Sequence, residues 1–392
     1  MKRNLAVVFG GKSVEHDVSI ITGQQLMDNA DPAKYNIIPI YISREGKWFT
    51  GPKLRDVQFM NTFDEKDKSV KQVYISPAAD TYELMEAAGS RFSGPKPVSR
   101  IDVAILAMHG MHGEDGTLQG LFELANIPYS SPGVLGSAVG MDKIVMKSVF
   151  KGCGFPVLDG IHFTRSEWKA DTEKVLMRIE DALTYPVFVK PANLGSSIGI
   201  GKASDRDALK NAIEVAVLYD RRILVENGVQ DIMEINCSCL GFDDDVRASV
   251  CEQPVNWEEF LTFEDKYMRG SNGKSAGMKS MDRRIPAPIE DSLRDEIQAL
   301  AIEVFKALDC KGVVRIDFIV DKEAGKTYVN EINTIPGSFS YYLWEPAGIP
   351  FAKLVETLDA IACKAHAEKN LNSYAFDSGV LKKMASGVKI NK

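Results

Sequence analysis

Residues 315–333, RIDFIVDKEAGKTYVNEIN, contain two short runs of β-forming residues with the turn-like segment DKEAGK between them. This pattern predicts a β-hairpin, and a hairpin limits which side chains can lie opposite one another. If Ala324 is at the centre of the turn, Asp317 and Glu331 are equally far from it and form a cross-strand pair. Side chains alternate between the two faces of a strand. One face then carries Arg315, Asp317, Ile319, Val329, Glu331 and Asn333, and the other carries Val314, Ile316, Phe318, Val320, Tyr328 and Ile332. The second set is nearly all apolar and is expected to face the core.

The polar face of this hairpin places two carboxylates opposite each other, which destabilises a ladder unless a cation offsets them. One interpretation is a solvated polar face on which Arg315 forms a surface salt bridge. The other is a metal site, because Asp317, Glu331 and Asn333 offer oxygen ligands of the kind that Mg²⁺ binds together with phosphate. The Pro-Gly turn of the TIPGSF segment that follows adds free backbone N–H groups. The pattern favours the metal site.

The chain of 392 residues is too long for one ordinary core, so two or three domains are expected. Its formal net charge of −7 and pI near 5.5 give no electrostatic footprint for nucleic acid or an anionic membrane. No apolar run approaches the ~18 residues that span a bilayer, so the expected partners are small molecules. Six scattered cysteines, without metal-ligand spacing or a secretory signal, are expected to be reduced core residues of a cytoplasmic protein. They are Cys153, Cys237, Cys239, Cys251, Cys310 and Cys363.

Strand-like and helix-like segments alternate in the N-terminal part of the chain. This alternation predicts an α/β fold with a doubly wound parallel sheet, whose ligands bind at the carboxyl ends of the strands. Gly10, Gly11 and the HGMHGEDG segment fall at such ends. Residues 44–100 are polar and irregular and are interpreted as an insertion or a loosely built edge. The expected units are an N-terminal domain at 1–133, a central domain at 134–228, a C-terminal domain at 229–370 and a tail at 371–392.

A Gly/Ser loop at residues 192–197 follows a predicted strand that ends near Lys190. It does not match the G-x-G-x-x-G pattern, and a strand follows it instead of a helix, so a dinucleotide-binding loop is excluded. The FGGKS segment fails the Walker A pattern, because Ala6 stands where a glycine is required. The loop could be a plain hairpin turn. The alternative, favoured by Lys190 beside it, is a flexible tip whose backbone N–H groups close over phosphate.

Segment 256–284 is basic although the protein is acidic. A solvated charge run is the usual interpretation of such a segment. Its aromatic residues and three glycines fit a lid over anions better. The basic residues are Lys266, Arg269, Lys274, Lys279, Arg283 and Arg284.

Three polar residues near the glycine turns are further candidates. His109 and His112 lack a third metal ligand, so His109 is predicted to position a substrate and no role is assigned to His112. Glu15 follows Ser13 near a predicted helix N-terminus. It could stabilise the helix dipole, or it could bind a cationic group of a substrate.

These motifs together resemble the D-alanine–D-alanine ligase family of ATP-grasp enzymes over nearly the whole chain. The resemblance runs from VVFGGKSVEHDVSI through HGMHGEDGTLQG and GMDK to RIDF and NEINTIPG. It implies a three-domain ATP-grasp fold and ATP-dependent ligation of two D-alanines, through an acyl phosphate, for peptidoglycan precursors. It further implies a cytoplasmic homodimer that uses ATP as co-substrate and two Mg²⁺ ions, with Mn²⁺ as an alternative.

The resemblance also implies roles for individual residues. Lys143 and Lys190 would contact the ATP phosphates, Glu226 and the Val229 backbone the adenine, Glu234 the ribose and Lys266 the γ-phosphate, while Asp317, Glu331 and Asn333 hold the metal. Glu15 would bind the ammonium of the first substrate, linked through Ser196 to Tyr267, and Arg315 with a backbone N–H near Gly337 would stabilise the oxyanion.

One position departs from the family pattern. Tyr342, followed by Leu343, stands where the family commonly has a small hydroxyl residue that binds the carboxylate of the second substrate. D-serine, D-lactate or another amino acid as second substrate is therefore an alternative. A nucleotide-binding regulator without turnover is another alternative, and the intact set of site residues argues against it.

Overall fold

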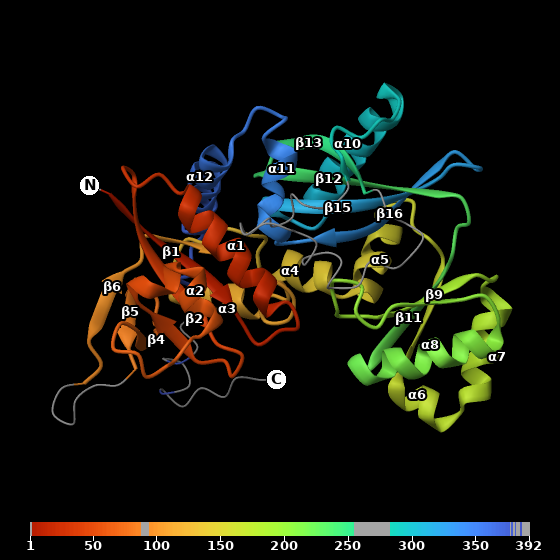
Figure 1. The fold of residues 1–392 in the computed structure, drawn as a ribbon, viewed down its shortest axis with the longest axis horizontal. Coiled ribbons are helices and arrows are strands. Elements are labelled where there is room, and N and C mark those ends of the chain that lie inside the picture. The colour runs from red at the N-terminus through yellow and green to blue at the C-terminus, as the bar shows by residue number, and fades with distance from the viewer. Residues whose placement is uncertain are drawn as a thin grey trace.

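The computed structural model describes residues 2–87, 94–254 and 283–376, together with residues 378, 381 and 385. In this part of the chain the strands form three sheets of seven, four and five strands (Figure 1). The fold is a mixed α/β fold with one sheet that contains parallel strands and two antiparallel sheets. No helix among these residues is both long and apolar enough to cross a bilayer.

The N-terminal sheet has the strand order β6-β5-β4-β3-β2-β1-β7. Three of its strands are parallel, as predicted: β1 (Arg3–Gly10), β2 (Tyr35–Ile42) and β7 (Val103–Leu106). The segment predicted to be irregular instead contributes four strands, each antiparallel to its neighbours: β3 (Trp48–Thr50), β4 (Lys71–Ile75), β5 (Glu83–Glu86) and β6 (Pro97–Arg100). These strands are short, which explains why they produce little periodic signal in the sequence. Helices α1 (His16–Asn29), α2 (Val57–Asn61) and α3 (Thr117–Ala125) and the 3₁₀ turn η1 (Pro52–Arg55) accompany the sheet.

The last long helix, α12 (Phe351–Lys369), packs on this N-terminal sheet although it is far away in the sequence (Figure 1). Leu354 and Leu358 belong to the same buried cluster as Leu5 of β1. The Asp359 carboxylate accepts hydrogen bonds from Arg3 Nη1 and from the Tyr35 hydroxyl, at 2.9 and 3.0 Å. Strand β1 and helix α12, from opposite parts of the described chain, therefore share one core.

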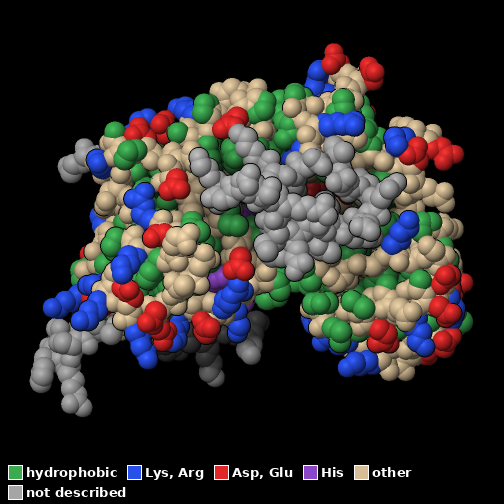
Figure 2. Space-filling view, viewed as in Figure 1, with side chains coloured by type: hydrophobic (Ala, Val, Ile, Leu, Met, Phe, Trp, Pro, Cys, Tyr) green, Lys and Arg blue, Asp and Glu red, His purple; other side chains and the backbone are tan. Residues whose placement is uncertain are grey.

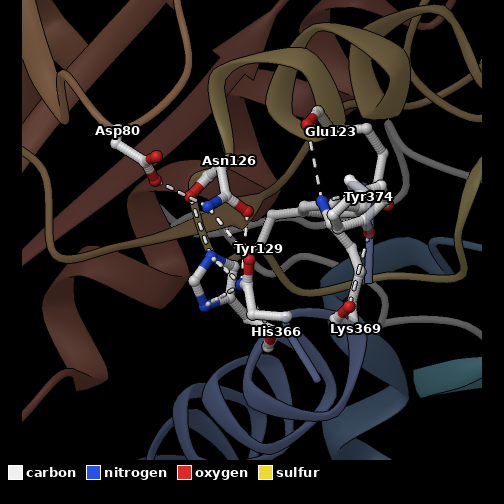
Figure 3. Close-up of polar contacts among 8 residues, drawn as sticks. Asp80, Glu123, Asn126, Tyr129, His366, Lys369 and Tyr374 are labelled. Atoms are coloured by element: carbon white, nitrogen blue, oxygen red, sulfur yellow. Dashed lines mark hydrogen bonds and ion pairs between the residues drawn. The ribbon is translucent and has the colours of Figure 1, made fainter. Parts of the chain in front are cut away.

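Polar contacts fasten the C-terminal end of α12 to the end of α3 (Figure 3). Lys369 Nζ lies 2.6 Å from Glu123 Oε2, and His366 Nε2 lies 2.8 Å from the Asn126 carbonyl oxygen. The Asn126 side chain in turn donates to Asp80 at 2.7 Å. Helix α12 is thus fixed along its whole length.

The four-stranded sheet is antiparallel, with the order β10-β9-β11-β8. Its strands are β8 (Gly160–Thr164), β9 (Val187–Pro191), β10 (Gly201–Ala203) and β11 (Arg222–Asn227). Helices α6 (Arg165–Ala170), α7 (Thr172–Ala182) and α8 (Arg206–Tyr219) share its buried core, which includes Trp168, Ile179 and Ile213. The predicted Gly/Ser loop connects β9 to β10.

The five-stranded sheet has the order β14-β13-β12-β15-β16 and is antiparallel throughout. Its strands are β12 (Ile232–Phe242), β13 (Asp245–Pro254), β14 (Arg283–Arg284), β15 (Lys311–Asp321) and β16 (Lys326–Asn333). Helix α10 (Asp291–Ala307) and helix α5 (Lys143–Gly152), which follows α4 (Val134–Met141), contribute to the core beneath one face. Cys237, Cys239, Cys251 and Cys310 lie in this core, as predicted. Cys153 does not; it is exposed, because α5 ends there at the surface.

The predicted hairpin forms, with one correction. Arg315 pairs with Asn333 and Asp317 pairs with Glu331, as expected, but a β-bulge follows, and Phe318 pairs with Val329. The extra residue moves Val329 into the core with Phe318 and pairs Tyr328 with Ile319, the reverse of the prediction for both residues. Because of the bulge, Val329 faces the core, while Asp317 and Glu331 stay paired on the polar face.

Candidate active site

A cross-strand row of polar residues marks one face of the five-stranded sheet. Glu252 pairs with Asn236, Asn236 with Asp317, and Asp317 with Glu331, across β13, β12, β15 and β16. Residues that are paired in successive ladders point to the same face of a sheet. The predicted acids thus belong to a longer row, and Glu252 and Asn236 escaped the sequence analysis because the register between the strands was unknown.

Asp317 is held by Arg315 on its own strand. Arg315 Nε and Nη2 donate to the two Asp317 oxygens, each at 2.7 Å, and Asn333 Nδ2 lies 3.0 Å from Asp317 Oδ2. Burial works to lower the pKa of Arg315, but the Asp317 carboxylate outweighs it and raises the pKa well above its usual range. Arg315 and all three predicted metal ligands are therefore brought together.

Lys143, at the start of α5, connects this hairpin to the Gly/Ser loop. Its Nζ lies 2.9 Å from Glu331 Oε2 and donates to the Leu194 carbonyl at 3.0 Å. The side chain of the preceding Asp142 caps the helix by accepting from the Ile144 and Val145 N–H groups. The cap fixes where the helix begins and so where the lysine points.

Glu226 at the end of β11 is clamped by two lysines. Lys147 Nζ is 2.6 Å from Oε1 and Lys190 Nζ is 2.7 Å from Oε2, and the Glu226 side chain is 1% exposed. Burial would raise the pKa of Glu226, but the two ammonium groups lower it to about 2. The sequence analysis missed Lys147, although it is four residues after Lys143 and so lies on the same side of α5.

The β-bulge in β16 also reaches this group. Lys190 Nζ donates to Asn330 Oδ1 at 3.4 Å, and Asn330 is the residue that the bulge leaves without a partner in the ladder. Glu234 on β12 is two residues before Asn236 and so shares its face of the sheet. Burial lowers the pKa of Lys190, but the Glu226 carboxylate, with a smaller contribution from the charge of Glu234, raises it. Val229 is partly buried between β11 and β12. The described residues of the predicted ATP-binding set thus gather between the two antiparallel sheets, whereas Lys266 lies outside the described residues.

Glu15, just before α1, is covered by the Gly/Ser loop. The Ser196 hydroxyl donates a hydrogen bond to Glu15 Oε1, and a Cβ on Gly195 would lie 2.9 Å from Glu15 Oε2. A Cβ on Gly110 would lie 2.6 Å from the same oxygen. Two glycines on opposite sides therefore leave room for this carboxylate, and the loop is closed onto the N-terminal domain.

Glu114 is a second carboxylate near Glu15 that the sequence analysis did not single out, although it lies within HGMHGEDG. Its oxygens accept hydrogen bonds from the Gly110 and Ile335 N–H groups, both at 2.8 Å. Burial and the charge of Glu15 raise the pKa of Glu114 to about 8. A cavity of about 350 Å³ opens beside Glu15, and its lining includes Lys12, Arg44, Met111 and Met141.

His109 contacts the turn that follows β16. Its Nδ1 lies 2.9 Å from the Ile335 carbonyl oxygen and its Nε2 lies 2.7 Å from Thr22 Oγ1. Burial lowers the pKa of His109 to about 4, so the imidazole is neutral. The structure thus places His109 where it positions this turn, and its predicted contact with substrate stays a prediction. His112 is exposed.

The turn itself, η3 (Gly337–Ser340), has an unusual backbone. Ser338, Phe339 and Ser340 have φ angles of 52°, 54° and 49°, in the left-handed region that non-glycine residues rarely adopt. The Ser338 N–H donates to Thr22 Oγ1 at 3.2 Å, and Phe339 is buried in the core of the N-terminal domain. Contacts from that domain therefore hold the backbone around Gly337.

Tyr342 and Leu343 lie in the short helix α11 (Tyr341–Trp344) that follows this turn, and both are buried. Leu343 packs in a small apolar cluster with Val250 and Ile285. Tyr342 lies under the Arg283 guanidinium, whose Cζ is 4.4 Å from the ring centroid. Arg283 and Arg284, which were counted with the basic lid, form strand β14 and pair with Pro254 and Gln253 of β13. Lys266 and Tyr267 lie outside the described residues.

The side-chain oxygens of Asp317, Glu331 and Asn333 suit a hard divalent cation. Among the described residues there is no group of three or more His, Cys, Asp or Glu side chains arranged to hold a metal. Two carboxylates with one amide oxygen on neighbouring strands still fit Mg²⁺, which takes few protein ligands and completes its shell with phosphate and water.

Positive and negative side chains are interspersed on the face seen in Figure 2, which shows no field of a single sign over its described part.

Comparison with known proteins gives one consistent result. Residues 4–132 match the family model "D-ala D-ala ligase N-terminus", and residues 149–359 match "D-ala D-ala ligase C-terminus". The chain is 40% identical over 384 residues to a D-alanine–D-alanine ligase of Geobacillus thermodenitrificans, covering 96% of this chain and 100% of the relative. It is 39% identical over 388 residues to that of Acetivibrio thermocellus, covering 95% and 99%.

Solved structures agree. The D-alanine-D-alanine ligase from Coxiella burnetii superposes with a TM-score of 0.78 at 27% identity, covering 99% of each chain. The VanG D-Ala:D-Ser ligase from Enterococcus faecalis superposes with a TM-score of 0.78 at 30% identity, covering 92% of this chain and 100% of the other.

Proposed function

This chain belongs to the D-alanine–D-alanine ligase family, and on that premise we propose that it joins two D-alanine molecules in an ATP-dependent reaction that supplies peptidoglycan precursors. The observation that carries the proposal is the arrangement of Asp317, Glu331 and Asn333 on one sheet face, with Lys143 and Lys190 beside it. Carboxylates and lysines arranged in this way suit a magnesium-bound triphosphate.

ATP would bind between the four-stranded and five-stranded sheets. Lys143 and Lys190 are proposed to contact its phosphates, and Glu234 its ribose. Glu226 would accept from the adenine amino group beside the Val229 backbone. Each Glu226 oxygen already faces one lysine, and a carboxylate oxygen has a second lone-pair direction left for this bond. Lys266 would reach the γ-phosphate, as the family resemblance implies.

Asp317, Glu331 and Asn333 would hold the divalent ions. The proposed number is two Mg²⁺, with Mn²⁺ as an alternative. When bound, these ions neutralise phosphate oxygens during phosphoryl transfer. Arg315 and Lys143, which pair with the two acids, hold both side chains in place before the ions arrive.

Glu15 would bind the ammonium of the first D-alanine. Its charge and the closed Gly/Ser loop orient the substrate so that its carboxylate attacks the γ-phosphoryl group, which yields ADP and an acyl phosphate. The Ser196 contact with Glu15 closes the loop over this site and keeps out water that would hydrolyse the acyl phosphate. Tyr267 is proposed to extend this contact to the lid.

The amine of the second substrate would then attack the acyl phosphate. Arg315 and the backbone N–H near Gly337 are proposed to stabilise the tetrahedral oxyanion before phosphate leaves. Arg315 binds Asp317 through Nε and Nη2, so Nη1 is the nitrogen that remains for this task. His109 and the left-handed turn place the Gly337 backbone.

The test is ADP release from the purified chain with ATP and Mg²⁺, measured with D- and L-amino acids singly and in pairs, with products identified by mass. D-alanine alone should give ADP and D-alanyl-D-alanine. A dipeptide formed with D-serine or another acceptor in preference to D-alanine would select the alternative that Tyr342 and the likeness to a D-Ala:D-Ser ligase favour. An absence of amino-acid-dependent ADP would leave a nucleotide-binding regulator.

Three coarser features are proposed with it. The three-domain division at residues 133 and 228 follows the family resemblance, as do a homodimer and a cytoplasmic location. Sedimentation of the purified chain tests the oligomeric state, and cell fractionation tests the location.

A further inference from the structure

Three side chains from different strands and helices meet beside Arg315: Tyr342 of α11, Arg283 of β14 and Glu252 of β13. The Arg283 guanidinium covers the Tyr342 ring, with Cζ 4.4 Å from the centroid, and its Nε lies 3.2 Å from Glu252 Oε1. The side chains of Arg283 and Glu252 are 5% and 3% exposed. This buried triad is a built feature, because a cation and an anion are rarely buried unless each is paired.

The Tyr342 hydroxyl and Glu252 Oε2 are both buried, and neither has a well-aligned hydrogen-bond partner among the described residues. Arg315 is the donor beside the hydroxyl. Buried phenols nearly always find a partner, because leaving one unpaired sacrifices its hydrogen bonds to water. With no well-aligned partner among the described residues, the Tyr342 hydroxyl is available to a group of a bound ligand.

The chemistry of that ligand group follows from its neighbours. The Tyr342 hydroxyl adjoins Arg315, whose Nη1 is the nitrogen not used by Asp317. Burial raises the pKa of Tyr342, with a smaller contribution from the charge of Glu252, so the hydroxyl keeps its proton and acts as a donor. A donor next to a guanidinium suits a carboxylate.

We propose that Arg283, anchored by Glu252, is a positioning residue that fixes the Tyr342 ring so that its hydroxyl binds the carboxylate of the second substrate. The inference rests on the proposed ligase function. Tyr342 is larger than the small hydroxyl residue that the family resemblance implies at this position. Its ring therefore has to be held in one orientation, and Arg283 and Glu252 hold it.

The test uses full-length enzyme with ATP, Mg²⁺ and D-alanine. Because the two D-alanines occupy different subsites, the rate is fitted with a separate KM for each. The double variant Arg283→Met/Glu252→Gln removes the cation without leaving a buried unpaired carboxylate. It is expected to raise the KM of the second substrate by about 10- to 100-fold, the range for a lost hydrogen bond to a charged group, and to leave the KM of ATP and of the first D-alanine unchanged.

Two further variants separate positioning from a structural defect. Arg283→Lys keeps a cation over the ring and should restore most of the affinity for the second substrate. Arg247→Met removes an exposed arginine from the same strand as Glu252 and should change nothing. Thermal melting of every variant identifies those that fold.

Two results would overturn the inference. A folded double variant with an unchanged second-substrate KM would refute the positioning role while leaving the ligase function intact. A wild-type enzyme that forms no dipeptide would refute the ligase function, and the inference would fall with it.

Discussion

Two groups of acids face the proposed active site, and they are held in different ways. Asp317 and Glu331 lie on strands and are paired with Arg315 and Lys143, which are fixed by the same sheet and by the start of α5. Glu15 lies just before a helix and is held by Ser196 of a loop that belongs to another sheet. The proposed metal end is thus built within one sheet and its flanking helix, whereas the proposed substrate end combines the segment before α1 with the loop between β9 and β10.

Of the substitutions that test this difference between the two groups of acids, Asp317→Asn should lower turnover the most. The variant keeps the shape and part of the hydrogen bonding to Arg315 but removes a charged metal ligand, so turnover should fall by about three orders of magnitude with little change in fold. Steady-state ADP release and Mg²⁺-dependent protection by ADP in thermal melts check it. Glu323→Gln in the exposed hairpin turn is the control. Normal activity in Asp317→Asn would remove the metal assignment.

Ser196→Ala should lower kcat less than Asp317→Asn does, and it should also uncouple ADP release from dipeptide formation. Loss of a charge-assisted hydrogen bond is worth about 10- to 100-fold in kcat, and an opened loop admits water, so ADP should be released in excess over dipeptide. The ratio of ADP to dipeptide measures this uncoupling, with exposed Ser204→Ala as the matched control. A tightly coupled Ser196→Ala enzyme would show that the loop closes without this contact.

Two buried acids near the site, Glu226 and Glu114, should also make stability respond to pH in opposite directions. Glu226 has a lowered pKa, so its contribution to the free energy of unfolding is present above pH 4.5 and is lost as the pH falls towards about 2. Glu114 has a raised pKa, so the stability associated with its proton is lost as the pH rises from about 4.5 through about 8. Thermal unfolding of wild type, Glu226→Gln and Glu114→Gln from pH 3 to pH 9 checks both signs.

Glu226→Gln should remove part of the acid sensitivity, and Glu114→Gln should remove part of the alkaline decline. Parallel pH profiles for the three proteins would contradict the opposite pKa shifts of Glu226 and Glu114.

The smallest effect on stability and turnover is expected for a surface ion pair far from the proposed active site. Lys53 and Asp67 form an ion pair on the antiparallel extension of the N-terminal sheet, and the Lys53 side chain is 54% exposed. Surface pairs of this kind contribute little. Lys53→Gln should leave the urea midpoint and the turnover unchanged, and a clear loss of either would show that the extension supports the site.

The sequence predicted the local pairing of the hairpin but not its bulge. Alternation and turn residues were enough to pair Asp317 with Glu331. The position of the extra residue, Asn330, depends on which side chain the core accepts, and that core includes helices α5 and α10, which lie outside the hairpin. The parallel strands β1, β2 and β7 were also predicted correctly, because each contains an apolar run that can be recognised locally in the sequence.

Partners across the fold could not be predicted in the same way. The contact of Glu226 with Lys147 joins β11 to α5, and that of Arg283 with Tyr342 joins β14 to α11. Neither pair has a spacing that a sequence reveals. The family resemblance supplied roles for Lys190 and Glu226 but none for Lys147, Glu252 or Arg283, and Arg283 was noticed only as one basic residue of segment 256–284.

The left-handed turn at Ser338–Ser340 has a consequence for how such enzymes can be rearranged. Each such residue costs about 1–3 kcal/mol, and the hydrogen-bond partners at the base of the turn, Thr22, His109 and Glu114, come from the opposite end of the polypeptide. A chimera that fused this C-terminal half to an N-terminal half from a distant relative would inherit the cost without the matching contacts. Recombination between relatives should therefore succeed only when both halves of this junction travel together.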